Sequence, residues 1–226
     1  MTVLDTRTSQ ALVNDRAHVF HSWSAQGMIS PIVVAGAEGS WFWDEDGKRY
    51  LDFSSQLVNV NIGHQHPKLV AAIQEQAARL CTIAPIHAND ARSEAARLIV
   101  ERAPGDLDMV FFTNGGAEAT ENAIRMARLH TGRHKVLTTY RSYHGATGGA
   151  IQLTGDPRRW PSEPGIPGVV KFWGPYTYRS AFHSEDEIQE SQRALQHLRD
   201  TLMVEGPQTV AAIMLDRKST RLNSSH

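Results

Sequence analysis

The sequence predicts an α/β fold built on a mostly parallel sheet. Short apolar segments alternate with amphipathic helical segments over most of the 226 residues. This alternation is typical of parallel sheets covered by helices. A glycine pair, Gly115-Gly116, joins one apolar segment to the helical segment that follows it. Ligands of open α/β sheets bind at such strand-to-helix junctions, so the same pattern indicates where a site lies.

The N-terminal 60 residues are predicted to form one helix and several short strands. The helix is expected between Leu12 and Ala25, where His18, Phe20, His21 and Trp23 give it an aromatic character. Strand-forming residues follow at Val33-Val34, Trp41-Phe42-Trp43 and Tyr50-Leu51, with turn residues at Gly36, Gly39 and Asp46-Gly47. We expect residues 1–60 to be a separate N-terminal segment.

From His66 onward the spacing of apolar residues becomes helical and then alternates with strands. Helices are predicted at 66–80, 89–103, 116–129 and 184–205, and strands at 108–113, 135–140 and 209–215. Residues Thr154 to Tyr178 are rich in Pro, Gly and Trp and are predicted to be a loop, although a long one for a compact domain. We expect residues 61–215 to form the α/β domain.

Composition excludes several classes of protein. Hydrophobic residues make up 41% and charged residues 21%, as in ordinary globular proteins. The 23 Lys and Arg residues balance 24 Asp and Glu residues, so no charge pattern favours nucleic acid or an anionic membrane. The single cysteine, Cys81, suits a reducing compartment, and no apolar run approaches membrane-spanning length. We expect a cytoplasmic protein.

The Gly115-Gly116 turn is a candidate anion site. The N-terminus of a helix presents free N–H groups and a positive dipole end, and Gly116 has no Cβ to block close approach of a phosphate. The alternative is a plain tight turn, in which Glu118 and Glu121 complement the helix dipole. This segment alone leaves both interpretations open.

A second candidate segment, Tyr140 to Ala150, follows the next predicted strand. Tyr143 and His144 are expected at the same sheet edge as the glycine turn. An aromatic ring beside a phosphate site suggests a flat phosphorylated cofactor. The alternative is a Tyr-His pair that packs the loop.

The histidines give no metal signature. His64 and His66 lack the helical i, i+4 spacing, and no cysteine or acidic ligand follows closely. A turn or helix entry at Pro67 is the favoured interpretation, so no metal site is expected. The sequence also lacks a G-x-S-x-G elbow, a Walker A loop and a G-x-G-x-x-G fingerprint.

Four stretches, in this order, resemble the class III aminotransferases, which depend on pyridoxal 5'-phosphate. They are WDEDGKRYLDFSS, NIGHQHPKLVAAI, FFTNGGAEATENAIRMAR and YRSYHGATGGA. The resemblance implies the type I fold of pyridoxal-phosphate-dependent transferases. It makes residues 61–215 part of the large cofactor-binding domain and residues 1–60 a small-domain or interface segment.

The resemblance also assigns site residues. The family's phosphate loop usually reads Asn-Ser-Gly-Ser-Glu-Ala, and here Gly115, Gly116 and Ala117 occupy it without the two hydroxyls. Phosphate binding is therefore expected from backbone N–H groups. Tyr143 is expected to stack on the pyridine ring, with His144 beside it. Trp23, Leu57 and Val58 are candidate substrate-pocket residues, with Val58 where the family often has tryptophan.

The lysine that forms the family's Schiff base with the cofactor is not identified in this chain. None of Lys48, Lys68, Lys135, Lys171 and Lys218 stands in the expected setting. Residues 216–226, DRKSTRLNSSH, break the last apolar strand and resemble a translated sequencing adapter, so we expect a non-native tail. We interpret the chain as the amino-terminal part of an aminotransferase that is inactive by itself.

The resemblance implies a homodimeric enzyme that moves an amino group from an amine or amino acid donor to an oxo acid. Two alternatives stay open. One is a decarboxylase or aminomutase with the same fold and cofactor. The other is a non-catalytic phosphate-binding module.

Overall fold

The computed structural model describes residues 6–216, with side chains from Gln10 onward. Contacts within the chain divide it into two units, Met1–Ser93 and Glu94–His226, which are described separately. The expected boundary at residue 60 stays a prediction. Residues 217–226 of the expected tail lie outside the described part. No helix among the described residues is long and apolar enough to cross a membrane.

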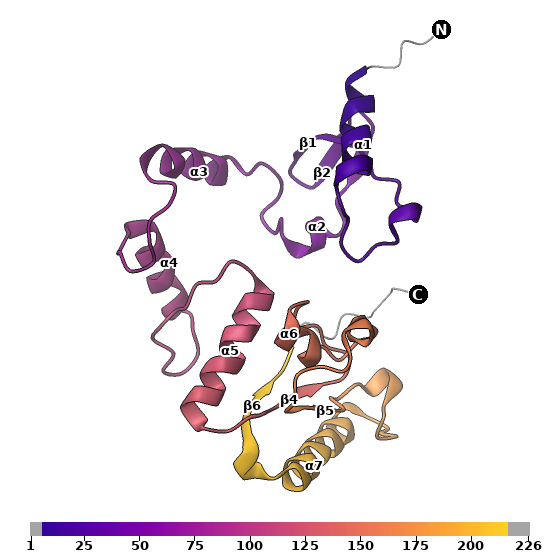
Figure 1. The fold of residues 1–226 in the computed structure, drawn as a ribbon, viewed down its shortest axis with the longest axis vertical. Helices are drawn as coiled ribbons and strands as arrows, with labels where there is room; N and C mark the ends of the chain where they lie inside the picture. The colour runs from indigo at the N-terminus through magenta and orange to yellow at the C-terminus, as the bar shows by residue number, and fades with distance from the viewer. Residues whose placement is uncertain (1–5, 217–226) are drawn as a thin grey trace. The chain divides into compact units, whose positions relative to one another are not determined.

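The first unit combines helices with a small antiparallel sheet (Figure 1). Its elements are α1 (Thr6–His18), η1 (Gln26–Met28), β1 (Val34–Glu38), β2 (Trp41–Asp44), β3 (Arg49–Leu51), α2 (Ser55–Val58), α3 (Pro67–Arg79) and the start of α4 (Asp90–Val100). The strands pair in the order β1-β2-β3, which confirms the short strands expected from the sequence. Gly47 adopts φ +79° in the turn between β2 and β3, as a tight hairpin requires.

The predicted helix from Leu12 to Ala25 is wrong in its second half. Helix α1 ends at His18, and the chain turns back on itself. His21 Nε2 lies 2.8 Å from Asp15 Oδ2, and Gln26 Oε1 accepts a hydrogen bond from His21 N at 3.1 Å. These side-chain bonds stabilise a turn in place of further helix, a competition that polar residues often win against helix propensity.

Helices α3 and α4 begin where the sequence places them. Pro67 occupies the first turn of α3, where a missing N–H costs nothing. Asn89 Oδ1 accepts a hydrogen bond from Arg92 N at 2.9 Å and so caps α4. Both predicted helix starts are confirmed.

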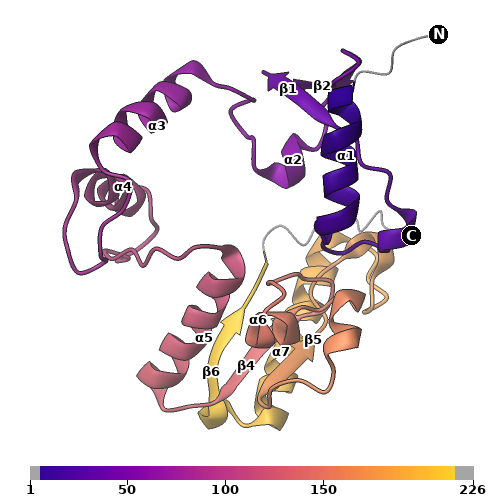
Figure 2. The ribbon, with the colours of Figure 1, turned by 45° about the horizontal axis from the view of Figure 1, so that its top comes forward.

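The second unit is an α/β layer structure with a parallel sheet. Its elements after α4 are α5 (Gly116–Thr131), β4 (Lys135–Thr139), α6 (Gly148–Leu153), η2 (Pro157–Ser162), β5 (Val169–Phe172), η3 (Thr177–Arg179), α7 (Glu187–Glu205), η4 (Pro207–Thr209) and β6 (Val210–Met214). The strands lie in the order β5-β4-β6 and run in one direction, as Figure 2 shows. The predicted α/β class and parallel sheet are confirmed.

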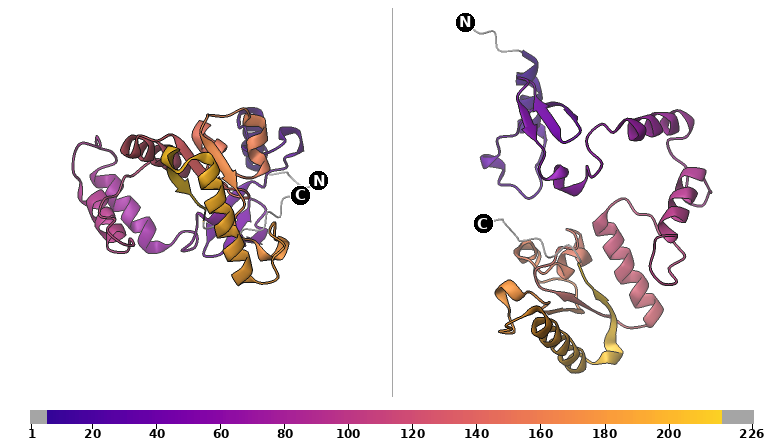
Figure 3. Two further views of the ribbon diagram at one scale, coloured as in Figure 1. Left: turned by 90° about the horizontal axis from the view of Figure 1, so that it is seen from below. Right: turned by 180° about the vertical axis from the view of Figure 1, so that it is seen from behind.

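Side chains that alternate along the central strand fill the two faces of this sheet. Val136 packs with Ile124 of α5 and Leu153 of α6 on one face. Leu137 packs with Phe172 of β5 and Val210 of β6 on the other, against which Leu198 and Leu202 of α7 also pack. The sheet therefore separates α5 and α6 from α7, which covers the opposite face (Figure 3).

Two predictions in this unit are wrong, and one helix was not predicted. Residues 108–113 form no strand, because they pair with no other described segment, and Met109 and Phe111 are exposed. The expected loop between Thr154 and Tyr178 contains strand β5, which its flanking Gly and Pro residues conceal in the sequence. Helix α6, which begins at Gly148, is an additional element that was not predicted.

Candidate functional site

The N-terminus of α5 is an open glycine turn. Gly115 is the N-cap, with extended backbone, and no side chain caps the helix from that residue. A Cβ placed on Gly115 or Gly116 would meet no atom within 4 Å. The first N–H groups of a helix have no intrahelical partner, so this turn offers donors to an anion with space in front of them.

One carboxylate lies close to this turn. Glu118 Oε2 accepts hydrogen bonds from Asn114 N at 2.9 Å and from Asn114 Nδ2 at 3.1 Å. The side chain therefore folds back over the residue before the N-cap. Its negative charge complements the helix dipole, which is the alternative role expected for Glu118, and an anion bound at the turn would lie close to this carboxylate.

The β4–α6 loop (Tyr140–Thr147) lies directly against the first two turns of α5. Thr120 Oγ1 donates a hydrogen bond to His144 O at 3.0 Å. Gly145 has φ +133°, and a Cβ on it would lie 2.6 Å from Ala117 Cβ. Only glycine allows this close approach. The first turns of α5 therefore contact the β4–α6 loop, which carries Tyr143 and His144 and begins after the carboxyl end of β4.

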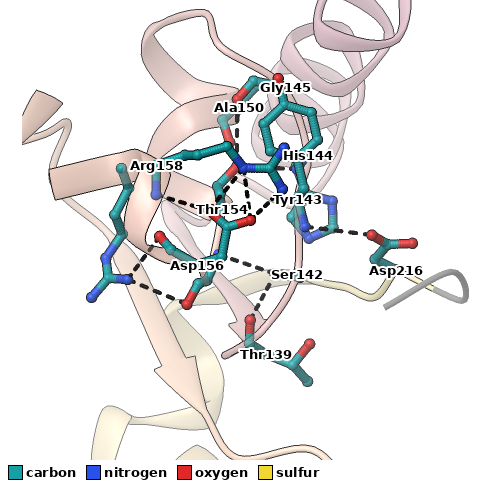
Figure 4. A network of polar contacts seen from close by, with 12 residues as sticks. Thr139, Ser142, Tyr143, His144, Gly145, Ala150, Thr154, Asp156, Arg158 and Asp216 are labelled. Carbon is teal, nitrogen blue, oxygen red and sulfur yellow. Dashed lines mark hydrogen bonds and ion pairs between the residues drawn. The ribbon is translucent and has the colours of Figure 1, made fainter. Parts of the chain in front are cut away.

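The ring of Tyr143 is held by an arginine. The guanidinium carbon of Arg158 lies 3.8 Å from the ring centroid (Figure 4). Arg158 Nε also donates to Asp156 Oδ2 at 2.9 Å, and the Asp156 side chain is only 4% exposed. Hydrogen bonding to this carboxylate raises the pKa of Arg158. No motif in the sequence indicated this pair, although Asp156 and Arg158 stand close to Tyr143 in the chain.

His144 is held at both its backbone and its ring. His144 N donates to Thr154 Oγ1 at 3.1 Å, and Nε2 lies 3.1 Å from Thr138 Oγ1 on β4. Burial lowers the pKa of His144, and the nearby Asp216 carboxylate opposes this shift only in part. The imidazole is therefore mainly neutral at pH 7.

The alternative interpretation of the sequence, in which Glu121 complements the dipole of its own helix as a first-turn acid, is not what the structure shows. Its Oε1 accepts from Thr147 Oγ1 at 2.6 Å, from Gly149 N at 2.7 Å and from Ala150 N at 3.0 Å. These donors belong to the N-terminal turn of α6, so α5 caps a neighbouring helix through Glu121. The spacing from Gly116 to Glu121 gives no local signal for this contact, which depends on tertiary packing.

The three substrate-pocket candidates lie in the first unit, whereas the glycine turn and Tyr143 lie in the second. Trp23 has φ +57° and a 58% exposed side chain. Leu57 and Val58 belong to α2, whose four residues all have positive φ. Left-handed backbone is costly for a β-branched residue such as Val58, and strained backbone of this kind clusters at functional sites.

Asp52 and His64 support this left-handed turn. Asp52 Oδ1 accepts from Gln56 N at 3.1 Å, and Asp52 Oδ2 lies 2.8 Å from His64 Nε2. Burial acts to raise the pKa of Asp52, but the hydrogen bonds from Gln56 and His64 outweigh it and lower the pKa overall. His64 thus pairs with a carboxylate in this fold.

Four lysines lie in the described part of the chain. Lys48 and Lys68 are exposed. Lys135 Nζ bonds to Glu205 Oε2 at 2.7 Å, and Lys171 Nζ donates to Gln152 O at 2.7 Å. Lys171 is a residue of β5, not of a loop as expected, and burial, with the nearby charge of Arg159, lowers its pKa.

Comparison with known proteins identifies the family. The model of the family described as aminotransferase class-III matches residues 23–217. The chain belongs to this family. Among curated relatives, an acetylornithine aminotransferase of Methanopyrus kandleri is 40% identical over 138 residues, which are 61% of this chain and 36% of that protein. A probable aminotransferase of Mycobacterium tuberculosis is 36% identical over 200 residues, which are 84% of this chain and 42% of that protein.

Solved class III structures share the fold. The taurine:2-oxoglutarate aminotransferase of Bifidobacterium kashiwanohense, solved with pyridoxal phosphate and glutamate, is 41% identical with a TM-score of 0.88. The match covers 96% of this chain and 49% of that chain. An (S)-enantioselective omega-transaminase of Thermomicrobium roseum is 35% identical with a TM-score of 0.85, over 91% of this chain and 48% of that one. The chain thus spans about half the length of the relatives that it matches.

Proposed function

We propose that the N-terminus of α5 binds the phosphate of pyridoxal phosphate and that Tyr143 stacks on the cofactor ring. The whole protein then transfers an amino group from an amine or amino acid donor to an oxo acid. The contact between the open Gly115-Gly116 turn and the β4–α6 loop carries this proposal. This contact supports the proposal because it places the N-terminal turns of α5 next to the loop that carries Tyr143. We further propose that the whole protein is a homodimer in the cytoplasm.

The glycine turn fits a phosphate that is bound by the backbone. Gly115, Gly116 and Ala117 contribute no hydroxyl, so the donors are the N–H groups of the turn, and the dipole of a 16-residue helix adds electrostatic attraction for the anion. The space in front of Gly115 and Gly116 is open in this structure, and a side chain at either position would enter it. The residues present therefore suit the phosphate group.

The β4–α6 loop carries an aromatic residue that suits stacking on the cofactor ring. Pyridoxal phosphate supplies an electron sink that weakens the bonds at the Cα of an amino donor. Tyr143 presents a flat aromatic ring, and Arg158 stabilises the position of this ring through a cation–π contact. A neutral His144 beside it adds no positive charge next to the cofactor at pH 7.

The lysine that bonds the cofactor is the part of the site that the described residues do not supply. Lys135 and Lys171, the two half-buried lysines, are engaged with Glu205 and with a backbone carbonyl. We propose that the lysine comes from a part of the whole protein outside this sequence. The chain by itself then binds the cofactor without turning over substrate.

A titration of the chain with pyridoxal phosphate, followed by cofactor absorbance, tests the binding proposal. We expect saturable binding that inorganic phosphate competes away. Tyr143→Ala should raise the Kd up to about tenfold, since an aromatic pair contributes about 0.5–1.5 kcal/mol beyond area burial. Tyr143→Phe, which keeps the ring, should bind like the parent. Equal affinities for the parent and Tyr143→Ala would contradict the stacking assignment.

Borohydride reduction tests the proposal about the lysine, and turnover assays test the type of reaction. The chain with pyridoxal phosphate should give no stoichiometric adduct at a single lysine; such an adduct at Lys171, for example, would show that the lysine is present after all. The full-length protein should aminate an oxo acid. Release of CO₂ or migration of the amino group would favour the decarboxylase or aminomutase alternative, and cofactor binding without any turnover would favour the non-catalytic module.

A further inference from the structure

Glu121 gathers three donors on one oxygen. Thr147 Oγ1, Gly149 N and Ala150 N lie 2.6, 2.7 and 3.0 Å from Glu121 Oε1. Two of these donors are backbone N–H groups in the first turn of α6. The N-cap residue of α6, Thr147, makes no capping hydrogen bond to them with its side chain. The carboxylate therefore replaces the missing cap and adds a negative charge at the positive end of that helix.

Gly149 has no side chain to keep the Glu121 carboxylate away from the backbone of α6. A Cβ on Gly149 would lie 2.4 Å from Glu121 Oε2, so glycine at that position lets the carboxylate reach the α6 backbone. Burial acts to raise the pKa of Glu121, but the hydrogen bonds from Thr147, Ala150 and Gly149 outweigh it and lower the pKa overall. The side chain is thus a carboxylate at neutral pH, the form that accepts all three bonds.

Glu121 stands on the same helix as the glycine turn, and the segment it holds carries Tyr143 and His144. Gly116 opens α5, and Glu121 follows it by five residues on the helix. Of the donors that it binds, Thr147 is the last residue of the β4–α6 loop, and Gly149 and Ala150 follow in α6; the other end of the loop continues from β4. A shift of α6 away from α5 would therefore move the loop relative to the glycine turn.

We propose that Glu121 is a positioning residue that sets the distance between the phosphate site at the N-terminus of α5 and the ring of Tyr143. This inference rests on the proposed function, because it assumes that both parts hold one cofactor. Glu121 itself does not touch the cofactor. It acts by holding the start of α6, and thereby the β4–α6 loop, against α5.

The test compares two ligands on the same chain. Binding of inorganic phosphate needs only the α5 turn. Binding of pyridoxal phosphate needs the turn and the ring of Tyr143 at the right distance from each other. Glu121→Ala should raise the Kd for pyridoxal phosphate about tenfold and leave the Kd for inorganic phosphate within about twofold, since buried donors are left unpaired at α6 but not at α5. Glu121→Gln keeps an acceptor oxygen and should recover part of the loss.

Amide hydrogen exchange gives a readout that needs no ligand. In Glu121→Ala the amides of Gly149 and Ala150 should exchange at least about tenfold faster, because they lose their acceptor. Thr147→Val removes only one of the three donors and should change this exchange less. Glu187→Ala, which removes an exposed acid from the first turn of α7, is the matched control and should change neither binding nor exchange at α6.

Each outcome decides one question. Selective loss of pyridoxal phosphate affinity together with faster exchange at α6 supports the inference. Unchanged affinity and exchange overturn it, and so does an equal loss of affinity for both ligands, which would mean that Glu121 supports the α5 turn itself. If the parent chain binds neither ligand, the proposed function is wrong, and the exchange rates alone then show whether Glu121 holds the loop.

Discussion

The guanidinium of Arg158 covers one face of the Tyr143 ring, with its carbon 3.8 Å from the ring centroid. The same guanidinium forms an ion pair with Asp156, whose side chain is almost fully buried. One arginine therefore links a buried carboxylate to the aromatic residue that we assign to the cofactor. The position of the ring depends on this pair as well as on the loop that carries it.

Arg158→Met should lower the free energy of unfolding by about 1–2 kcal/mol. The substitution keeps a long apolar stem but removes the cation over the ring and leaves the Asp156 carboxylate without its guanidinium partner. Urea denaturation of the chain measures the effect. Arg102→Met, which removes a 72% exposed arginine, is the control and should shift the midpoint far less. Equal shifts for the two variants would show that the Arg158 contacts add no stability.

Gly116→Val should weaken phosphate binding and leave the stability of the fold almost unchanged. A Cβ at Gly116 meets no protein atom within 4 Å, so the substitution should cost under about 1 kcal/mol of stability. The branched side chain would occupy the space in front of the helix N–H groups. Loss of one charge-assisted hydrogen bond raises a Kd by about ten- to a hundredfold, and we expect this for both phosphate and pyridoxal phosphate.

Gly148→Val is the matched control for this experiment. Gly148 stands at the start of α6, and a Cβ there also meets no atom within 4 Å. If any open glycine at a helix start bound phosphate, the two variants would lose affinity alike. We expect the loss at Gly116 alone, measured by isothermal titration with inorganic phosphate.

Much of this fold follows from local sequence. The β1–β3 strands, the starts of α3 and α4, and α5 with β4 were all predicted from turn residues, caps and apolar spacing. The glycine turn and the Tyr143-His144 loop were also expected at one edge of the sheet; the structure places the loop against α5, although the strand expected before the glycine turn is not formed. These features depend on periodicity and topology, which a single sequence carries.

The features that were missed depend on contacts between distant residues. Segment 108–113 has strand-forming residues, but no described strand pairs with it, and strand propensity alone does not make a strand. Helix α6 begins with two glycines that disfavour a helix, and Glu121 of another helix supplies its cap. Strand β5 is only four residues long and is stabilised by its pairing with β4.

Acid should destabilise the second unit partly through Glu190. This α7 residue is 1% exposed; its carboxylate accepts from Tyr176 N at 2.7 Å and also from Ser180 Oγ. Burial acts to raise the pKa of Glu190, but these bonds and the charge of Arg193 lower it overall. A carboxyl group with a lowered folded-state pKa stabilises the fold above its unfolded pKa of about 4.3, and this stability is lost as the pH falls through the folded pKa.

Glu190→Gln should therefore be less stable than the parent at pH 7, by about 1–3 kcal/mol, and should lose less stability on acidification. Urea denaturation between pH 7 and pH 3.5 measures both effects. Glu187→Gln, an exposed acid on the same helix, should follow the parent at every pH. A Glu190→Gln curve parallel to the parent curve would mean that Glu190 titrates alike in the folded and unfolded chains.

Strand β6 presents an edge that other chains can pair with. Among the described strands, β6 pairs only with β4, so the backbone groups along its other side are not paired in this sheet. Ile213 and Leu215 are 41% and 62% exposed at this edge. An open apolar edge strand is a template for intermolecular pairing, so the isolated chain should self-associate in a concentration-dependent way.

Light scattering after gel filtration of two lysine variants tests whether the β6 edge causes this association. Ile213→Lys places a charge on the edge strand and should shift the chain toward monomer, as charged residues do on natural edge strands. Val204→Lys removes an 88% exposed apolar residue from α7 and is the control for general surface hydrophobicity. Because strand pairing needs an edge and not merely apolar area, Val204→Lys should leave association almost unchanged. If both variants reduced it equally, exposed apolar surface in general would be the cause, and the β6 edge would have no special part in it.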